Sequence, residues 1–317
     1  MNDFPLPRQK RILITGASSF SALHLTRLLA TEPRSDLYGT SRSHSQHACW
    51  KNYFVGDITD KSFIDNVVET TSPTHIFHLA GVTDTEKLDE LLLVNLKGTW
   101  NLLKACRKLP ESAKLLIVGS AASYGEMEPS EKSLPPSRPA KPNSLYGWVR
   151  EKSFELASLL GDQSNLDIKF CRTFNLIGPG LPEKYAPTAI ILRMLARSKS
   201  DSSVFSVACS DSVRDFVDVR DACRAWLGIL ESGETAKPYS IGSGIPVTIL
   251  QLTELIRDRL GMTFPIASNN EIASAERSTI RKSIADTESL ERDIKWTRYI
   301  KLEQSIDDML SHLRCDN

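Results

Sequence analysis

Metal-binding and disulfide-forming patterns are missing from this sequence. The six histidines form no HExxH or comparable arrangement, and the six cysteines include no CxxC pair. Because structural zinc sites and disulfide frameworks depend on such spacings, we expect neither a metal nor a disulfide. His78 lies inside an apolar run, which favours a role in the core over ligand binding. The cysteines are Cys49, Cys106, Cys171, Cys209, Cys223 and Cys315.

An excess of charge of one sign is missing as well. Lys and Arg together number 39, Asp and Glu also number 39, and no long run of one sign occurs. Proteins that bind nucleic acid or anionic membranes concentrate basic residues, so this balance indicates a small-molecule ligand and neither of those partners. The sequence has no stretch of 18 uncharged apolar residues, and its start, MNDFPLPRQK, has no apolar signal-peptide core. We therefore expect a cytoplasmic protein.

Short apolar runs alternate with segments of helical periodicity through the first part of the chain. The amphipathic segments include KLDELLLVNLKGTWNLLKACRK and LYGWVREKSFELASLLG. Such alternation predicts an α/β fold with a doubly wound parallel sheet of the Rossmann type. The runs typical of strands are RILITG, DLYGTSR, THIFHLAG, AKLLIVGS and DIKFCRTFN.

The alternation loosens after Gly180. From there on, helical segments such as QLTELIRDRLG and LEQSIDDMLSHL are separated by stretches that contain Pro and Ser. We predict that residues 1–180 form a dinucleotide-binding domain to which residues 206–246 return. Residues 181–205 and 247–317 would then form a smaller, mostly helical C-terminal lobe that binds the substrate.

The turn after the first strand, TGASSFSA at residues 15–22, has the features of a phosphate-binding loop. In doubly wound sheets this turn brings backbone N–H groups and a helix N-terminus to a pyrophosphate. The spacing of Gly16, Ser19 and Ala22 resembles the TGxxGxxG turn of short-chain dehydrogenases, with only the first glycine retained. Ser19 puts a Cβ where the backbone should approach phosphate, so we expect either a positive φ there or a hydroxyl that binds the phosphate. The alternative is a serine-rich turn that binds nothing.

Further motifs follow in the order typical of one enzyme family. GDITD comes after the expected third strand, FHLAG ends the fourth, VNLKGTWNLLKAC contains Asn95, and RTFNLIGPG and VRDFVDVRDA come later. Together these motifs, from Ile12 to about Ile306, resemble the extended short-chain dehydrogenase/reductase family of nucleotide-sugar enzymes. Within it they most resemble reductases that act on GDP-4-keto-6-deoxy-mannose. The resemblance implies that the cofactor is bound by Gly16, Ser19, Phe20, Ser41, Arg42, Asp57, Ile58, Leu79, Ala80, Gly81, Asn95, Tyr146 and Arg150.

The end of the second strand indicates which cofactor is used. An acidic residue there hydrogen-bonds the ribose of NAD, whereas an arginine accommodates the 2′-phosphate of NADP. The strand ends GTSRS, with Ser41 and Arg42 and no carboxylate nearby, because Asp36 precedes the strand. We expect NADP rather than NAD, with an exposed surface arginine as the alternative interpretation of Arg42.

The resemblance implies that Ser120, Tyr146 and Arg150 carry the chemistry. Ser120 would hydrogen-bond the sugar oxygen, and Tyr146 would transfer the proton. Arg150 stands four residues after Tyr146, on the same helix face, where the family has a lysine. Arginine keeps the positive charge but cannot lose a proton to a relay. The alternative is a tyrosine and an arginine that only pair on a helix surface.

The remaining motifs indicate the substrate. By resemblance, Asn175 and Arg214 would contact its diphosphate, Arg277 would approach the nucleotide, and Ser120 and Ala121 would contact the sugar. Family members that dehydrate the sugar carry an acidic pair directly after this serine, whereas this chain has two alanines, which disfavours a 4,6-dehydratase.

Three functions are compatible with these motifs. We expect an NADP-dependent reductase of a 4-keto-6-deoxy nucleotide sugar, with a GDP-linked sugar as the substrate. The alternatives are a nucleotide-sugar 4-epimerase with tightly held NAD and a non-catalytic NADP or nucleotide-sugar binding protein of the same fold. The resemblance also implies a homodimer, formed through the apolar helices LDELLLVNLKGTWNLLKAC and LYGWVREKSFELASLL.

Overall fold

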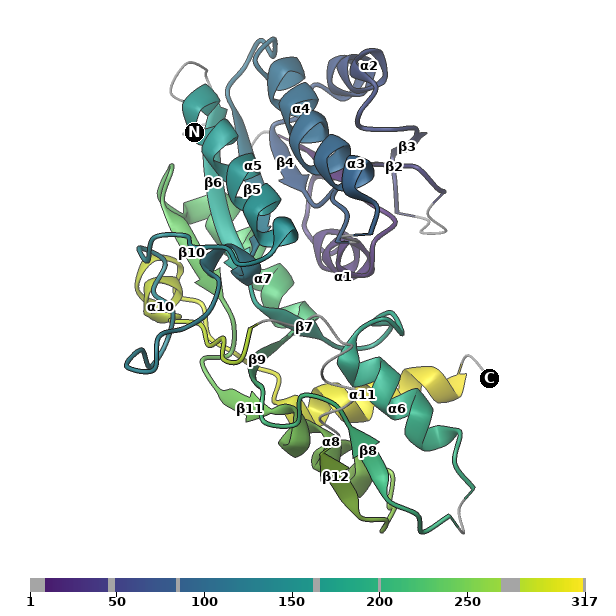
Figure 1. Ribbon diagram of the computed structural model, residues 1–317. Coiled ribbons are helices and arrows are strands. Elements are labelled where there is room, and N and C mark those ends of the chain that lie inside the picture. Colours follow the sequence, from purple (N-terminus) through teal and green to yellow (C-terminus); the bar gives the residue numbers. More distant parts are fainter. Residues whose placement is uncertain are drawn as a thin grey trace, which may run out of the picture. The chain divides into compact units, whose positions relative to one another are not determined.

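The computed structural model describes residues 9–44, 49–83, 86–161, 166–198, 201–268 and 280–315. Within them, one seven-stranded sheet has the strand order β10-β6-β5-β4-β1-β2-β3 (Figure 1). Its strands are β1 Lys10–Thr15, β2 Ser35–Ser41, β3 Asn52–Val55, β4 His75–His78, β5 Ala113–Ser120, β6 Leu166–Thr173 and β10 Pro238–Ile241.

Neighbouring strands in this sheet pair in parallel in the four cases described next. Strand β1 lies between β2 and β4 and is parallel to both, with Ile12 opposite Leu37 on one side and His75 on the other. Strand β2 is parallel to β3, and β4 is parallel to β5. Parallel neighbours need crossover connections, and here helices lie between β1 and β2, between β3 and β4 and between β4 and β5. The predicted doubly wound α/β fold is therefore confirmed.

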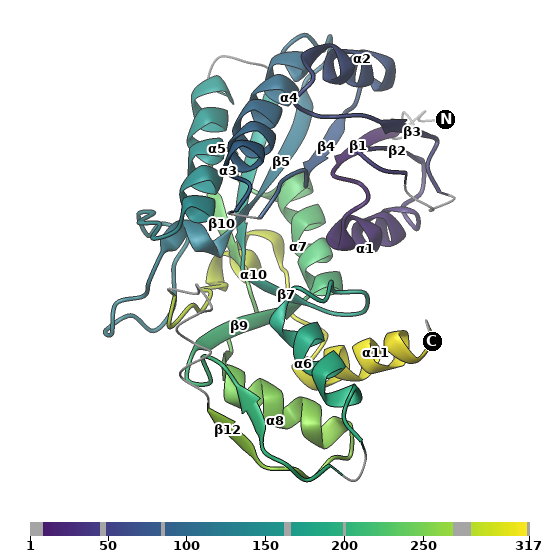
Figure 2. The same ribbon diagram turned by 45° about the vertical axis from the view of Figure 1, so that its right-hand side comes forward.

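Helices cover both faces of the sheet. In Figures 1 and 2, α1 lies on one face, and α2, α4 and α5 lie on the other. The apolar positions that predicted these elements point inward: Leu13 of β1, Ile76 of β4 and Leu102 of α4 are completely buried. Burying one such side chain contributes about 1.5–3 kcal/mol. The helices are α1 Phe20–Leu29, α2 Lys61–Thr71, α3 Leu88–Leu92, α4 Thr99–Cys106 and α5 Leu145–Gly161.

A π-helical segment, η1 Leu93–Gly98, joins α3 to α4. The sequence predicts one regular helix over this stretch, and the local widening is a difference from that expectation. A π segment inserts an extra residue into a turn and is frequent at functional sites. Here it contains Asn95, whose side chain is completely buried.

The chain divides into two compact units. The first contains the described residues up to Gly119 together with Val149–Cys171 and Trp226–Lys237, and the second contains the other described residues. The sequence analysis divided the chain differently, into a dinucleotide-binding domain and a substrate-binding lobe. The limits of these two regions stay a prediction.

The second unit combines helices with short strands. It contains a three-stranded sheet of order β11-β9-β7 and a two-stranded sheet of β12 and β8, beside its helices. These short strands show no clear alternation in the sequence, because only three to six residues belong to each. The strands are β7 Asn175–Ile177, β8 Phe205–Val207, β9 Val213–Asp218, β11 Pro246–Thr248 and β12 Ile266–Ser268. The helices of this region are η2 Ala121–Tyr124, α6 Ala186–Leu195, α7 Val219–Ser232, which runs into the first unit, α8 Ile249–Arg259, α10 Glu288–Ile294 and α11 Leu302–Cys315.

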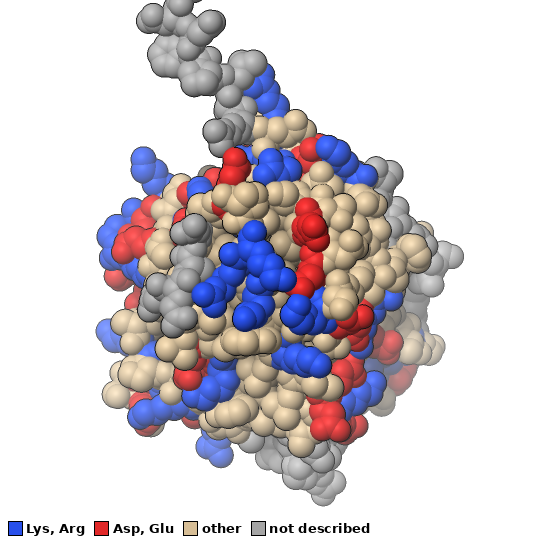
Figure 3. Space-filling model, turned by 90° about the horizontal axis from the view of Figure 1, so that it is seen from above, with Lys and Arg blue, Asp and Glu red and all other residues tan. Residues whose placement is uncertain are grey.

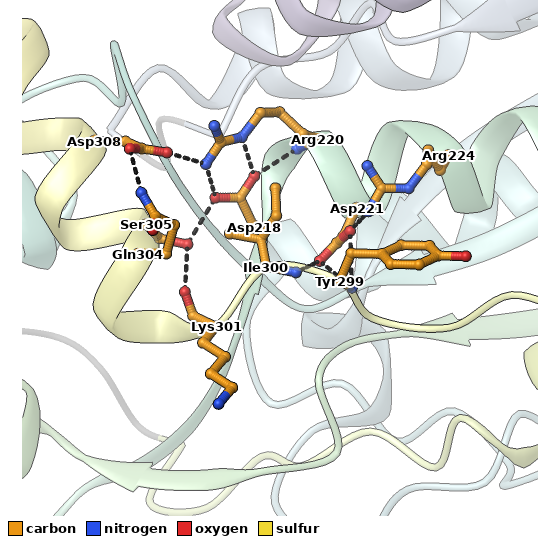
Figure 4. Close-up of polar contacts among 10 residues, drawn as sticks. All are labelled: Asp218, Arg220, Asp221, Arg224, Tyr299, Ile300, Lys301, Gln304, Ser305 and Asp308. Carbon is orange, nitrogen blue, oxygen red and sulfur yellow. Dashed lines mark hydrogen bonds and ion pairs between the residues drawn. The ribbon is translucent and has the colours of Figure 1, made fainter.

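Two buried aspartates attach the C-terminal segment to the second unit (Figure 4). Asp218 accepts hydrogen bonds from Arg220 and, at 2.6 Å, from the hydroxyl of Ser305 on α11. Asp221 accepts a hydrogen bond from the backbone N–H of Ile300 at 2.9 Å. A buried carboxylate is costly unless it is paired, so breaking these hydrogen bonds would be unfavourable. The contacts therefore fix the position at which α11 begins.

The surface carries charges of both signs. Figure 3 shows a face on which a group of Lys and Arg side chains lies beside Asp and Glu side chains. Among the residues that the structure describes, no helix is long and apolar enough to cross a membrane.

Candidate functional site

A cavity lies where the first four strands of the sheet end, and its lining residues all belong to the first unit. It is formed by the turns after β1, β2, β3 and β4, together with Val94 of η1. Phe20, Asn95, Tyr146 and Arg150 do not line it. The predicted cofactor residues that do line it are Gly16, Ser19, Ser41, Arg42, Asp57, Ile58, Leu79, Ala80 and Gly81.

Gly16 is the glycine that this cavity requires. Its φ is +69°, and a Cβ at this position would lie 2.7 Å from the backbone nitrogen of Ala80. No side chain fits between the turn after β1 and the turn after β4 at that distance. The retained first glycine of the motif therefore reflects a close approach of two backbones.

Ser19 adopts an extended backbone conformation rather than one with a positive φ. Its φ is −74° and its ψ is 157°, so the expectation of a positive φ is wrong. The residue is the N-cap of α1, and its hydroxyl oxygen accepts a hydrogen bond from the backbone N–H of Ala22 at 3.3 Å. Serine suits such a cap, which explains how the turn dispenses with a second glycine. Phe20, the first residue of α1, lies outside the cavity. Its ring packs against that of His24, with 5.3 Å between the ring centroids.

Arg42 is paired within the protein. Its guanidinium donates to the carboxylate of Glu90 on α3, and the two side chains are 58% and 29% exposed. The hydroxyl of Ser41 donates to the carbonyl oxygen of Ser43 at 2.6 Å and also lies 2.6 Å from the hydroxyl oxygen of Tyr53. Burial raises the pKa of the Tyr53 phenol. This end of the cavity thus combines one cation with a group of hydroxyls.

Asp57 and Ile58 shape the edge of the cavity after β3. One carboxylate oxygen of Asp57 accepts a hydrogen bond from the backbone N–H of Thr59 at 2.8 Å. The carbonyl oxygen of Ile58 accepts from the Asn101 side chain at 3.1 Å. The turn after β3 is therefore stabilised by a hydrogen bond within the turn and by another from a side chain of α4.

His78 is a core residue, as the sequence predicts. It is 1% exposed and lies between the hydroxyls of Thr15, 2.8 Å from Nδ1, and Thr99, 2.9 Å from Nε2. Thr99 donates its proton to the carbonyl oxygen of Asn95, so Nε2 must donate to Thr99 and Nδ1 must accept from Thr15. Burial and then the charge of Arg150 lower the pKa of His78 to about 3. The ring is neutral and serves as a spacer between β4, β1 and α4.

Arg150 is almost completely buried, at 8% exposure, and its hydrogen bonds go to the protein. One terminal nitrogen donates to the Asn95 side-chain oxygen at 3.0 Å, and the other donates to the carbonyl oxygen of Val118. A Cβ on Gly81 would lie 2.8 Å from this guanidinium, so the glycine leaves room for it. The Asn95 amide nitrogen donates to the carbonyl oxygens of Val82 and Leu91. The Nε atom of Arg150 is buried and has no hydrogen-bond partner among the described residues.

Ser120 and Tyr146 belong to neighbouring segments of the second unit. The Ser120 hydroxyl oxygen caps η2 by accepting from the backbone N–H of Ala122 at 3.2 Å. A Cβ on Gly147 would lie 2.3 Å from the carbonyl oxygen of Ala122, so the first turn of α5 rests directly on η2. The hydroxyl of Ser123 donates to the Gly147 carbonyl oxygen at 3.3 Å across the same contact. Gly147 thus allows the segment that contains Tyr146 to pack closely against the segment that contains Ser120.

The predicted substrate residues of the second unit are engaged with its backbone. The Asn175 amide donates to the carbonyl oxygen of Asp215 at 3.1 Å. The Arg214 guanidinium donates to the carbonyl oxygen of Ile280 at 2.7 Å, and burial lowers its pKa. Ala121 is 7% exposed, and Arg277 lies outside the described residues.

Sequence reasoning missed Tyr53 and Glu90. Tyr53 falls on β3, where an aromatic residue ordinarily signals only strand propensity. Glu90 lies 48 residues after Arg42 and reaches it only through the fold. No local pattern in the sequence identifies Tyr53 as a partner of Ser41 or Glu90 as a partner of Arg42.

The fold and the cavity are those of a dinucleotide-binding protein with the doubly wound sheet, in which ligands bind beyond the carboxyl ends of the strands. The family model of the NAD dependent epimerase/dehydratase family matches residues 12–242. The chain belongs to this family.

Relatives cover almost the whole chain. The chain is 27% identical over 311 residues to GDP-6-deoxy-D-mannose reductase of Pseudomonas aeruginosa, a match covering 95% of the chain and 96% of that relative. It is 26% identical over 250 residues to GDP-6-deoxy-D-talose 4-dehydrogenase of Aggregatibacter actinomycetemcomitans, covering 78% and 79%. Among solved structures, RMD from Pseudomonas aeruginosa complexed with NADPH superposes with a TM-score of 0.83 at 24% identity and covers 98% of the chain and 100% of RMD.

Proposed function

We propose that this protein is an NADP-dependent reductase of a 4-keto-6-deoxy nucleotide sugar, with a GDP-linked sugar as the substrate. The observation that carries the proposal is the match to GDP-6-deoxy-D-mannose reductase, which spans 95% of the chain and 96% of the relative. The structure of RMD with NADPH has the same fold.

The cavity supports a dinucleotide as the ligand. Gly16 lets two backbones meet where a Cβ would lie 2.7 Å from the neighbouring chain, and α1 begins at this point, so N–H groups and the positive helix end are available to phosphate. Arg42 provides a cation at the other end, where a 2′-phosphate of NADP would bind. We therefore expect NADPH to bind more tightly than NADH and Arg42→Ala to remove most of the difference.

In the proposed mechanism, NADPH held in this cavity would supply the hydride for the keto carbon, and Tyr146 would donate a proton to the oxygen that becomes the hydroxyl. Ser120 hydrogen-bonds that oxygen and orients it. Arg150 holds a fixed positive charge on the same helix as Tyr146, where it stabilises the phenolate left after proton transfer. The two alanines after Ser120 put no carboxylate at this position, which supports reduction over dehydration.

We also propose that the protein is a homodimer. Leu93 and Trp100 on the η1–α4 segment are 46% and 40% exposed, and Trp148 and Leu159 on α5 are 42% and 68% exposed. Large exposed apolar side chains on two helices are typical of an interface. Light scattering at micromolar concentration tests this, and a monomer would contradict it.

The function is tested by incubating the protein with NADPH and a panel of 4-keto-6-deoxy nucleotide sugars while following the absorbance of the reduced cofactor. Oxidation of NADPH with a GDP-linked keto sugar is the expected result. Tightly retained NAD with interconversion of sugar epimers would favour an epimerase instead. Ligand binding without turnover of any sugar would favour a binding protein.

A further inference from the structure

The ion pair of Arg42 and Glu90 combines the two features that separate NADP sites from NAD sites. Among the described residues that line it, Arg42 is the one with a cationic side chain. The sequence shows no carboxylate near Arg42, yet the fold brings one there, because the guanidinium donates to the carboxylate of Glu90 on α3. An arginine at this point favours a 2′-phosphate, and a carboxylate favours a ribose 2′-hydroxyl.

The neighbouring groups make Arg42 the main donor at this end of the cavity. The hydroxyl proton of Ser41 is committed to the carbonyl oxygen of Ser43 at 2.6 Å. The Tyr53 hydroxyl lies 2.6 Å from Ser41 and 3.0 Å from the same carbonyl oxygen. Among the described lining residues, the cationic donor offered to an anion is therefore Arg42, whose guanidinium is already bound to Glu90.

We propose that Glu90 sets the discrimination between NADPH and NADH by competing with the 2′-phosphate for Arg42. The inference rests on the proposed function, in which this cavity binds NADP(H). A phosphate dianion beside Glu90 is repelled, or it must displace the carboxylate, and either event weakens the binding of NADPH. The 2′-hydroxyl of NADH carries no charge and can donate a hydrogen bond to Glu90. With the pair present, the preference of the site for NADPH over NADH is therefore smaller than it would be with Arg42 alone.

The Arg42–Glu90 pair is suited to such an exchange. Its side chains are 58% and 29% exposed, so water reaches both groups. Exposed ion pairs are worth only about 0.2–1 kcal/mol, and a phosphate that binds arginine through two hydrogen bonds can replace one of them. Glu90 lies in the first turn of α3, at the start of the helical stretch that continues through η1 and α4.

Equilibrium titration of NADPH and NADH, followed by calorimetry or by the fluorescence of the reduced nicotinamide, tests the inference. We expect Glu90→Gln to raise the affinity for NADPH by about three- to tenfold and to leave that for NADH unchanged or slightly lower. Asp89→Asn is the matched control. It removes the same negative charge from an exposed side chain next to Glu90 in the sequence. Its effect on either cofactor should stay within about twofold. In an Arg42→Ala background, Glu90→Gln should raise the affinity for NADPH by less than it does in the unmodified protein, because the competition for Arg42 is gone.

Three results would overturn the inference. If Glu90→Gln leaves NADPH binding unchanged or weakens it, Glu90 holds Arg42 in place for the phosphate instead of competing with it. If Asp89→Asn has the same effect as Glu90→Gln, the cause is the general charge of the surface. If the unmodified protein binds neither NADPH nor NADH, the proposed function itself fails, and this outcome is seen before any variant is compared. Thermal unfolding of each variant without cofactor checks that the fold is unchanged.

Discussion

Replacing Arg150 separates the charge at this position from its shape. The guanidinium bridges Asn95 Oδ1, at 3.0 Å, and the carbonyl oxygen of Val118. At 8% exposure neither bond can be exchanged readily for water. Arg150→Met removes both donors and leaves two acceptors in the interior. Arg150→Lys keeps the charge but replaces a planar, two-pronged donor with a single ammonium group on a different stem.

The expected loss of stability follows from those contacts. An unsatisfied buried acceptor costs about 1–3 kcal/mol. Two of them in Arg150→Met therefore predict a loss of about 2–5 kcal/mol, with the lower part favoured because the methionine also removes a buried charge. The ammonium of Arg150→Lys can satisfy one acceptor, so we expect a loss of about 1–3 kcal/mol. Turnover should persist in Arg150→Lys, because a positive charge remains four residues from Tyr146.

Urea unfolding followed by circular dichroism measures these differences as shifts of the midpoint at unchanged slope. Lys152→Met is the control, because Lys152 lies on the same helix and pairs at 2.6 Å with Glu155, an exposed residue. Removing such a surface pair should change the stability by about 0.5 kcal/mol or less. If Arg150→Met unfolds at the same midpoint as the unmodified protein, the guanidinium does not stabilise the interior in the way described.

The remaining predictions concern single residues of the same region. His78 has a folded pKa of about 3, below the ordinary histidine value of 6.5, so the neutral ring contributes stability that is present above pH 6.5 and is lost as the pH falls toward 3. Linkage predicts about 2 kcal/mol less stability at pH 5 than at pH 8 from this group, and His78→Gln should remove that part of the slope in urea titrations. Tyr146→Phe should lower turnover by about 10²–10⁴-fold while the affinity for cofactor, measured by titration, stays nearly unchanged. Gly147→Ala should lower turnover and thermal stability together, since its Cβ would lie 2.3 Å from the Ala122 carbonyl oxygen; equal activity would show that η2 and α5 can move apart. Gly16→Ala should weaken cofactor binding in titrations, because its Cβ would lie 2.7 Å from the nitrogen of Ala80.

The sequence by itself determined the architecture of the first unit. Strand and helix periodicities are local properties, and they predicted β1, α1 and α5 because each element buries one face along its own length. Gly16 could be predicted for a related reason, since a tight turn after a strand demands a residue that tolerates positive φ. The weakly periodic segments were the ones that the sequence did not predict: short strands such as β7 and β11 have too few residues to show an alternation.

Only the tertiary structure decided how the site is connected. Ser19 could be seen as a lost glycine, but that it caps α1 depends on backbone angles that the neighbouring strands impose. The partners of Arg150 come from η1 and β5, and the carboxylate on Arg42 comes from α3, 48 residues away. Hydrogen bonds and ion pairs of this kind act over a few ångströms between segments that are distant in sequence. Their formation depends on the packing of the whole unit, which no local pattern of residues specifies.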